Sequence, residues 1–541
     1  MENGRFIFKN FSKSLKFRHI TSIFFKKHKA SFFEAFLFID LIMKRYLIII
    51  LFLNILYSDI QRLNSSNRIR YDFMNYDNNT PEVNNFRDED ELLDFIESIF
   101  ESNLIPGLSI AVVKNNNIVW EKQFGFANID ENILVDENTM FILSSISKTV
   151  TATALMMLHE QNLFMLDDDI DNYLPFNVNH PDYPLTPITF KMLLSHTSGI
   201  KDNWNVMPYY DGDSQIELNN YLSQYLIPGG ELYNDNSNFT NSIPGTNYNY
   251  SNIGAALIGL LVEEISNQPF NQFCNDNIFT PLGMDNAFWF LSEIENLNQV
   301  ALPYQVTGGS GDTCYEIGCG VYDSSNSCFC DMACVEYGDC CQDYDEVCGE
   351  DGTGSAPSNL VPYENYGYAD YPSGQLRTSA NNLANFMSLF INDGYHEGVR
   401  ILDSETIELI KTIHFPQVNS SQGLIWYYKN NNQLFGHNGG DLGSLTEMFL
   451  SFTNNLGVVI LSNSSNYSAI IQIEDAIFNF AQENEFSMIG DINSDSLINI
   501  QDIILTVNLI LSNEYSGSVD LNTDNAIDIL DIVQLVNIIL N

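Results

Sequence analysis

The order of apolar segments between residues 88 and 483 constrains the fold of this chain more than any other feature. IPGLSIAVVKNNNIVWEKQFGFAN at 105–128 predicts a β-hairpin with an Asn-rich turn. LTEMFLSFTNNLGVVILSNSS at 445–465 predicts two more strands around an Asn-Asn-Leu-Gly turn. Apolar residues at helical spacing predict helices at 149–164, 250–266 and 469–482. Strands at both ends with helices between them indicate an α/β fold of the α+β type, an antiparallel sheet flanked by helices.

The chain is strongly acidic beyond its first residues. It has 541 residues and a formal net charge of −46, but ten of its 23 basic residues lie in the first 45 positions, against three acidic ones. The remainder carries 13 basic and 66 acidic residues, a net charge of −53. Such a surface repels phosphate backbones and anionic lipids, which argues against nucleic acid as a partner. The length predicts about two to four domains.

A secretory signal is predicted near the N-terminus. Lys44 and Arg45 precede YLIIILFLNILY and then Ser58. A basic pair followed by about twelve apolar residues is typical of a signal peptide and is short for a membrane span, with an uncleaved anchor as the alternative. We expect a true start at Met43, a leader and signal peptide over 1–58, and an Asn-rich linker over 59–87. The protein is then expected to be secreted: extracellular, at the cell surface or periplasmic.

Ser145-Ile-Ser-Lys148 is the first motif that suggests chemistry. In Ser-x-x-Lys on a helix the two side chains lie one turn apart on one face, so the amine can take the serine proton. The spacing occurs twice, because Ser198 and Lys201 share it. Ser145 begins an apolar helix, whereas Ser198 lies in the polar stretch HTSGIKDNW, which favours Ser145. The alternative for Ser145 is an N-cap serine beside a solvated lysine.

Two further segments suit such a nucleophile. Tyr250, in PGTNYNYSN, precedes an apolar helix, and a tyrosine beside a lysine can shuttle protons. His437 is followed by Asn-Gly-Gly, and small residues on an edge strand let a substrate carbonyl approach. The N–H groups of Gly440 and Ser145 would be the two halves of an oxyanion hole. A lone histidine such as His437 also suits a structural role.

These segments together resemble the class C beta-lactamase-like and penicillin-binding serine hydrolases. IPGLSIAVVKNN resembles the opening hairpin, FILSSISKTVTATALMMLHEQ the nucleophile helix and ITFKMLLSHTSGI the Leu-Leu-x-His-Thr-Ser-Gly signature. PGTNYNYSNIGAALIGLLVEEIS resembles the Tyr-x-Asn region, and GHNGGDLG the His-x-Gly form of the third box. The order is kept, with 105 residues from Ser145 to Tyr250 and 187 from Tyr250 to His437. The resemblance covers residues 88–483 apart from an insert.

The resemblance implies a beta-lactamase/transpeptidase-like fold with an all-helical part beside the sheet. It implies acyl transfer to water through an acyl-enzyme, with no cofactor for catalysis. Ser145 would be the nucleophile, Lys148 its activator and Tyr250 the proton shuttle. Asn252 would hold the amide or ester of the substrate, a small molecule or peptide. The catalytic site would comprise Ser145, Lys148, Tyr250, Asn252, His437, Gly439 and Gly440.

The third box bears on the substrate. Beta-lactamases of this family usually carry a lysine there, a cation for the drug's carboxylate, whereas His437 is at best partly protonated near neutrality. This favours an esterase, amidase or D-amino-acid peptidase, with a beta-lactamase or D-alanyl-D-alanine carboxypeptidase as the alternative. Arg377 is a second candidate cation, or equally a surface residue.

Other kinds of protein suit the sequence less well. A non-catalytic binding or scaffold protein that kept the fold is the alternative of another class, and the retained Ser145, Lys148 and Tyr250 argue against it. No Gly-x-Ser-x-Gly occurs, which argues against an α/β-hydrolase. Of the eight histidines two lie in the leader, and no His-x-His or His-x-x-x-His pair occurs, which argues against a metal-dependent hydrolase.

Eight of the nine cysteines lie within residues 314–348, between glycine-rich flanks. Adjacent cysteines do not suit tetrahedral zinc, and eight cysteines after a signal peptide predict four disulfides, for which 105 connectivities exist. CFCDMACVEYGDCCQDYDEVC resembles a somatomedin-B module, which implies a protein-binding knot inserted at 312–350; a rigid, inert insertion is the alternative. Cys274 is expected to be a free, buried thiol. The predicted disulfide cysteines are Cys314, Cys319, Cys328, Cys330, Cys334, Cys340, Cys341 and Cys348.

An Asp/Asn pattern occurs twice in the tail, 29 residues apart, and each copy precedes an apolar helix. Oxygen ligands at positions 1, 3, 5, 9 and 12, with a backbone carbonyl at position 7, suit calcium, so two Ca²⁺ ions are expected. The usual Gly at position 6 is replaced by Ser496 and Asn525. The unit resembles a type I dockerin, which implies that residues 487–541 bind a cohesin-like protein; a calcium-stabilised cap is the alternative. The predicted ligands are Asp491, Asn493, Asp495, Leu497, Asn499, Asp502, Asp520, Asn522, Asp524, Ala526, Asp528 and Asp531.

Overall fold

The computed structural model describes residues 86–115, 117–307, 359–396, 398–431, 433–484, 486, 490–493, 498–512, 519–521 and 526–540. The chain divides into two units, Met1–Leu63 and Asn64–Asn541, and all described residues belong to the second. The predicted signal peptide and the cysteine module at 312–350 lie outside the described residues. Four predicted calcium ligands do so too: Asp495, Leu497, Asn522 and Asp524.

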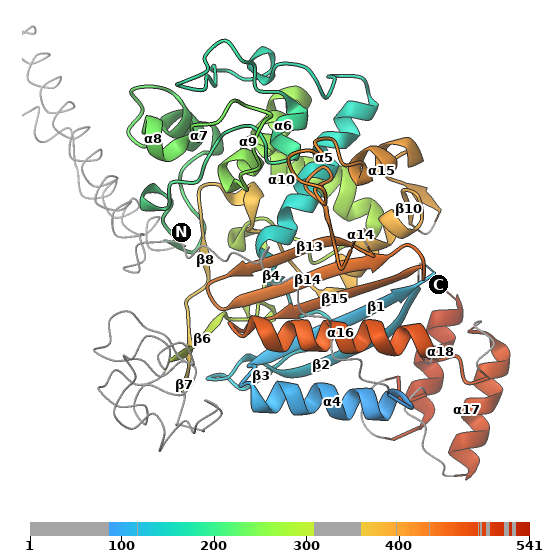
Figure 1. The fold of residues 1–541 in the computed structure, drawn as a ribbon. Helices are drawn as coiled ribbons and strands as arrows, with labels where there is room; N and C mark the ends of the chain where they lie inside the picture. Colours follow the sequence, from blue (N-terminus) through green and yellow to red (C-terminus); the bar gives the residue numbers. More distant parts are fainter. Residues whose placement is uncertain are drawn as a thin grey trace, which may run out of the picture. The chain divides into compact units, whose positions relative to one another are not determined.

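A seven-stranded antiparallel sheet forms the centre of the described unit, with strand order β12-β13-β14-β15-β1-β2-β3 (Figure 1). The predicted hairpin is confirmed, and the strands near the C-terminal end pair with it, because Ile110 of β1 lies opposite Ile460 of β15. The expected antiparallel sheet is therefore present. Its strands are β1 Gly107–Lys114, β2 Asn117–Asn128, β3 Ile133–Leu134, β12 Tyr427–Lys429, β13 Leu434–Asp441, β14 Ser444–Ser451 and β15 Leu456–Ser462.

One face of the sheet is covered by α4 (Glu89–Ser102) and α16 (Tyr467–Glu483), which Figure 1 shows lying along it. Side chains alternate along a strand, so Leu108, Ile110 and Val112 of β1 pack toward these two helices. The helix predicted at 469–482 is confirmed as α16.

The other face of the sheet packs against the larger helical part, which contains the predicted helices after Ser145 and Tyr250. Ala111 and Val113 of β1 face this side. The helices are α5 Ser147–Glu160, α6 Phe190–Leu194, α7 Leu218–Leu226, α8 Asp235–Asn238, α9 Asn252–Ser266, α10 Phe270–Cys274, α14 Ala380–Ile391 and α15 Ser404–Lys411. Short strand pairs join the segments: β4 Phe141–Ile142 with β9 Arg377–Thr378, β5 Tyr210–Asp211 with β8 Tyr366–Gly367, β6 Tyr304–Thr307 with β7 Asn359–Pro362, and β10 Tyr395–His396 with β11 Val399–Arg400.

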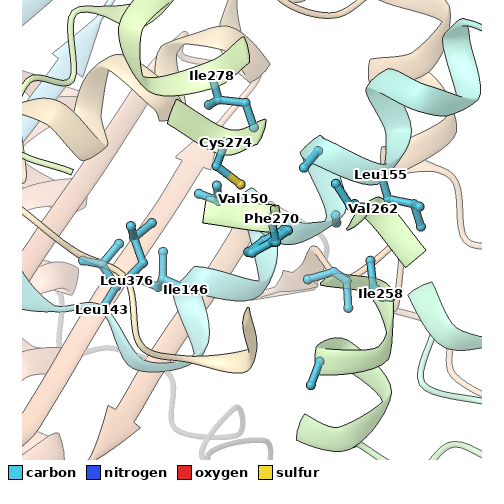
Figure 2. Packing of buried hydrophobic residues seen from close by; sticks show 14 of the residues in the cluster. Leu143, Ile146, Val150, Leu155, Ile258, Val262, Phe270, Cys274, Ile278 and Leu376 are labelled. Carbon is cyan, nitrogen blue, oxygen red and sulfur yellow. The ribbon is translucent and has the colours of Figure 1, made fainter. Parts of the chain in front are cut away.

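Helix α5 lies at the centre of this helical part. Every residue from Ser147 to Met156 is buried, as expected of a helix with small or apolar residues on all sides. Figure 2 shows Leu155 of α5 beside Val262 of α9, and Val150 of α5 beside Cys274 of α10. The sulfur of Cys274 lies in the same apolar cluster, and burial raises the pKa of this thiol. Cys274 is therefore a free, buried cysteine, as predicted.

The two helices predicted in the tail are α17 (Ile500–Ser512) and α18 (Ile529–Leu540), which contact each other. The carboxylate of Asp502 accepts backbone N–H groups from Ile492 at 2.9 Å and Asn499 at 2.8 Å. Asp531 does the same with Leu521 at 2.8 Å and Asp528 at 2.7 Å. In each loop the carboxylate at position 12 thus binds the backbone at positions 2 and 9.

The described residues contain neither a membrane-spanning helix nor a cluster of metal-binding side chains. No helix within them combines the length and the hydropathy needed to cross a bilayer. No group of three or more His, Cys, Asp or Glu side chains that could hold a metal ion occurs among them.

Candidate active site

Ser145 lies in a 3-10 turn, Ser144–Ile146, that leads directly into α5. Ser144 has a left-handed backbone with φ of +50°, which is unfavourable for a residue with a Cβ and persists only where the surroundings hold it. The surroundings are backbone contacts of Leu143: its N–H donates to the carbonyl of Leu376 at 2.8 Å, and its carbonyl accepts from Thr446 Oγ1 at 2.9 Å. The turn is therefore held against β14 and against the residue that directly precedes β9.

Lys148 lies one turn further along, and its side-chain nitrogen reaches back to the serine. Lys148 Nζ lies 2.9 Å from Ser145 Oγ and 2.6 Å from the carbonyl oxygen of Ser373. The Lys148 side chain is fully buried, whereas Ser145 is partly exposed. A substrate can therefore reach the hydroxyl while the amine stays sheltered from bulk water. The alternative of a solvated lysine at 148 is wrong.

The carbonyl of Ser373 reaches Lys148 because a short turn, Tyr371–Ser373, packs closely on α9. Gly259 makes this approach feasible, since a Cβ there would lie 2.6 Å from Pro372 Cβ. The hydroxyl of Ser373 donates to Asp370 Oδ2 at 2.8 Å, and both side chains are buried. The Ser373 carbonyl that contacts Lys148 is thus held in place by the hydrogen bond from the Ser373 side chain to Asp370.

Tyr250 lies on the other side of Lys148. Lys148 Nζ lies 4.9 Å from the centre of the Tyr250 ring. The His196 ring lies 4.5 Å from the Tyr250 ring and the His437 ring 6.2 Å from it. The structure thus brings the side chains of Ser145, Lys148, Tyr250 and His437 into one cluster.

Asn252 is the first residue of α9, two positions beyond Tyr250. It is half-buried, and its side-chain amide donates to Asp202 Oδ2 at 2.9 Å. Asp202 is buried, which raises the pKa of its carboxyl group; the N–H groups of Asn252 and Ile253 oppose this rise. Asp202 is a residue that the sequence analysis did not single out.

The third segment, His437 to Gly440, lies on β13. The pairing with β12 ends at Gly436, so His437 and the residues after it have only β14 as a ladder neighbour among the described strands. Gly439 lies against the nucleophile turn: a Cβ there would lie 2.3 Å from the carbonyl oxygen of Leu143. This stretch is therefore an edge, and its small residues allow it to touch the turn that carries Ser145.

His437 is a neutral residue in this setting. Burial lowers its pKa to about 3, and the neighbouring charge of Lys148 acts in the same direction. Its Nδ1 lies 2.5 Å from the carbonyl oxygen of Asn438, which fixes Nδ1 as the protonated nitrogen. His196 is also buried, and burial lowers its pKa well below the usual value. Neither imidazole supplies a cation near neutral pH.

Arg377 differs from one expectation. It is 1% exposed, so the surface alternative is wrong. Its guanidinium donates to the carbonyl oxygens of Gln375 at 3.2 Å and Tyr366 at 2.5 Å. These contacts bind β9 to β8, a tertiary arrangement that the local sequence does not encode.

The second Ser-x-x-Lys pair has a different geometry. Ser198 is buried and its hydroxyl accepts the N–H of Ile200 at 3.3 Å, while Lys201 is exposed. The same loop supplies His196 and Asp202, which contact the Tyr250–Asn252 segment. Its role in the site is therefore one of support. The second Ser-x-x-Lys spacing, within HTSGIKDNW, drew attention to this loop in the sequence. Nothing in the loop indicated which segment its side chains would contact.

Comparisons with known proteins show which family the chain belongs to. A family profile described as "Beta-lactamase" matches residues 92–476, which is more than half of the chain. "Protein flp" of Staphylococcus aureus (strain MW2) is 23% identical over 429 residues, covering 77% of this chain and 72% of that protein.

Solved structures show the same fold. The octameric penicillin-binding protein homologue from Pyrococcus abyssi has a TM-score of 0.51 at 21% identity and covers 78% of this chain and 81% of its own. The D-amino acid amidase from Ochrobactrum anthropi SV3 has a TM-score of 0.51 at 17% identity, covering 72% of this chain and 99% of its own. The chain therefore belongs to the beta-lactamase family and is a serine hydrolase with the beta-lactamase fold.

Proposed function

We propose that this protein is a secreted acyl hydrolase in which Ser145 is the nucleophile and Lys148 its activating base. The observation that carries the proposal is the 2.9 Å contact between Ser145 Oγ and the buried Nζ of Lys148. A base within hydrogen-bond reach of a serine hydroxyl is the arrangement that nucleophilic catalysis needs. The surrounding carbonyl of Ser373 and ring of Tyr250 fix where the lysine nitrogen lies.

In the proposed reaction Lys148 acts as the neutral amine, and the Ser145 proton passes to it as Oγ attacks the substrate carbonyl carbon. The N–H groups of Ser145 and Gly440 stabilise the oxyanion that develops on the carbonyl oxygen. The carbon–leaving-group bond then breaks, and the proton held by Lys148 passes through the Tyr250 hydroxyl to the leaving amine or alcohol. A water molecule then attacks the acyl carbon, one of its protons passes through Tyr250 and Lys148 to Ser145 Oγ as the bond between Oγ and the acyl carbon breaks, and the acid product leaves. Asn252 and the edge at His437 and Gly439 would hold the substrate beside Ser145.

The neutral state of His437 supports a substrate without a carboxylate at the third box. A lysine there would attract an anion, whereas an imidazole with a pKa of about 3 carries no charge between pH 5 and 8. The buried Arg377 donates to two backbone carbonyls instead. We therefore propose esters, amides or D-amino-acid peptides as the substrate class, in preference to carboxylate-bearing lactams.

A substrate panel tests this proposal. Purified protein is assayed with p-nitrophenyl esters, D-alanyl peptides and amides, and nitrocefin, each beside a Ser145→Ala variant. We expect turnover of an ester or a D-amino-acid substrate that exceeds nitrocefin turnover and disappears in Ser145→Ala. Nitrocefin as the best substrate would overturn the substrate class, and activity retained by Ser145→Ala would overturn the nucleophile.

Secretion and the inserted module are also proposals. We propose cleavage after a signal peptide that ends near Ser58 and a module of four disulfides over 312–350 that binds a protein. Supporting the first is the basic pair before twelve apolar residues; supporting the second is the dense cysteine spacing. N-terminal sequencing of the secreted product and thiol counting under denaturing conditions test them. An uncleaved product, or eight titratable thiols in the module, would contradict them.

For the tail we propose two bound calcium ions and a protein-binding surface for a cohesin-like partner. The closure of each loop on Asp502 and Asp531 supports the calcium sites, whose remaining ligands would be the oxygen donors named above. Helix α17 supports the surface, because it exposes an apolar stripe at helical spacing. The stripe consists of Ile500, Ile504, Val507 and Leu511.

A further inference from the structure

The carboxylate of Asp202 makes four hydrogen bonds to the segment that begins α9. Oδ2 accepts from the backbone N–H of Asn252 and from its side-chain amide, both at 2.9 Å. Oδ1 accepts from Ser251 Oγ and from the backbone N–H of Ile253, both at 3.1 Å. One buried side chain therefore fixes the backbone at the start of the helix and the Asn252 side chain together.

More contacts than a helix cap requires converge on this segment. The N-cap of α9 is already formed by Ser251, whose hydroxyl accepts the N–H of Gly254 at 2.9 Å. His196, from the same loop as Asp202, accepts the N–H of Ser251 at 3.3 Å, and its ring packs at a tilt against the Tyr250 ring, with 4.5 Å between the ring centres. The bond from Asp202 to the Asn252 side chain adds nothing to capping, but it sets the direction of the amide that the proposed function assigns to substrate binding.

We propose that Asp202 is a positioning residue that holds Asn252, and through the adjacent backbone Tyr250, in the orientation needed beside Ser145. This inference rests on the proposed function. It assigns to the loop His196–Asp202, which carries the unused Ser198-x-x-Lys201 pair, the task of supporting the second catalytic segment. Asp202 itself is assigned no contact with the substrate.

Asp202→Asn is the informative substitution because it keeps the shape and removes two of the acceptor positions. Each carboxylate oxygen meets one backbone N–H, that of Asn252 or that of Ile253, and a backbone N–H cannot reverse its polarity. The amide that replaces the carboxylate must therefore leave one of the two unpaired, and the Asn252 side chain shifts or flips. A displacement of about 1 Å in a substrate-positioning group costs roughly 10²-fold in rate.

The experiment is a double-mutant cycle on kcat/KM with the best ester or amide substrate, using Asp202→Asn, Asn252→Ala and the double variant. We expect Asp202→Asn to lower kcat/KM by roughly 10²-fold in the parent and by far less once Asn252 is already alanine. Asp88→Ala, which removes the carboxylate that caps α4 by accepting the N–H of Glu91 at 3.0 Å, serves as the control: it lowers Tm but keeps kcat/KM close to that of the parent.

Asp202→Glu is a second variant in case Asp202→Asn does not fold. It keeps the charge and acceptors but moves the carboxylate by one methylene, so kcat/KM should again fall only while Asn252 is present. An equal loss of kcat/KM with and without Asn252, or a lower Tm with unchanged kcat/KM, would overturn the proposal. Ser145→Ala separates the two levels: if it retains activity, the proposed function itself has failed.

Discussion

Gly439 offers a sharp prediction, because the strand that carries it touches the turn that carries Ser145. A Cβ at this position would lie 2.3 Å from the carbonyl oxygen of Leu143 and 2.3 Å from Thr446 Oγ1. Ordinary van der Waals contact begins at 3.4 Å, so Gly439→Ala forces a displacement of about 1 Å. The Leu143 oxygen is backbone and cannot rotate away, so either the nucleophile turn or β13 must move.

The expected magnitude follows from that displacement. Overpacking of this kind costs about 1–3 kcal/mol of stability, and a shift of about 1 Å between reacting groups costs roughly 10²-fold in rate. Thermal unfolding and kcat/KM on a p-nitrophenyl ester measure the two effects. We expect Gly439→Ala to lose both stability and activity.

A second glycine in the same region provides the control. A Cβ at Gly254, in the first turn of α9, would meet Ser251 at 3.4 Å, which is ordinary contact. Gly254→Ala should therefore keep activity and gain stability, since alanine favours the helix. Full activity and an unchanged Tm in Gly439→Ala would refute the inferred contact between β13 and the nucleophile turn.

Three further predictions concern the base, the histidines and the tail. Lys148→Met should lower kcat by roughly 10²–10⁴-fold, which is the usual contribution of a general base. Lys201→Met, at an exposed position, should leave kcat unchanged. Equal effects of the two substitutions on kcat would contradict the assignment of Lys148 as the base. The folded-state pKa of His437, about 3, lies below the ordinary histidine value of 6.5, so between these two pH values only the unfolded state gains a proton. The contribution of His437 to the free energy of unfolding is therefore fully present above pH 6.5 and falls by about 1.4 kcal/mol per pH unit below it. Urea unfolding at pH 7.5, 6 and 5 should show that His437→Asn loses less stability with falling pH than the parent does. Identical slopes would refute a neutral, buried His437. Chelation of calcium should lower the unfolding temperature of the tail while ester hydrolysis persists, and a parallel loss of hydrolysis would mean that the tail and the catalytic part are coupled.

Much of the fold followed from local patterns. The hairpin at 105–128, the helix after Ser145 and the strands at 445–465 are each encoded by period and turn residues within about twenty positions. The antiparallel sheet itself was also predicted, from strands at both ends of the segment with helices between them, but the register that puts Ile110 opposite Ile460 was not.

The long-range contacts that hold the site residues in place could not be predicted from such local patterns. Asp202 meets Asn252 across 50 residues, and Lys148 meets the carbonyl of Ser373 across 225. Such contacts depend on tertiary packing, such as the close approach allowed by Gly259, and leave no periodic signal. Arg377 shows the same limit, because a charged residue within a polar stretch gave no indication that it would be fully buried.

The central claim is that Ser145 forms the acyl-enzyme. The most direct measurement is mass spectrometry of the protein after reaction with a fluorophosphonate or a penicillin, with peptide mapping of the modified residue. We predict a single adduct on Ser145, absent from Ser145→Ala and unchanged in Ser198→Ala. An adduct on another residue, or none on folded protein, would contradict it.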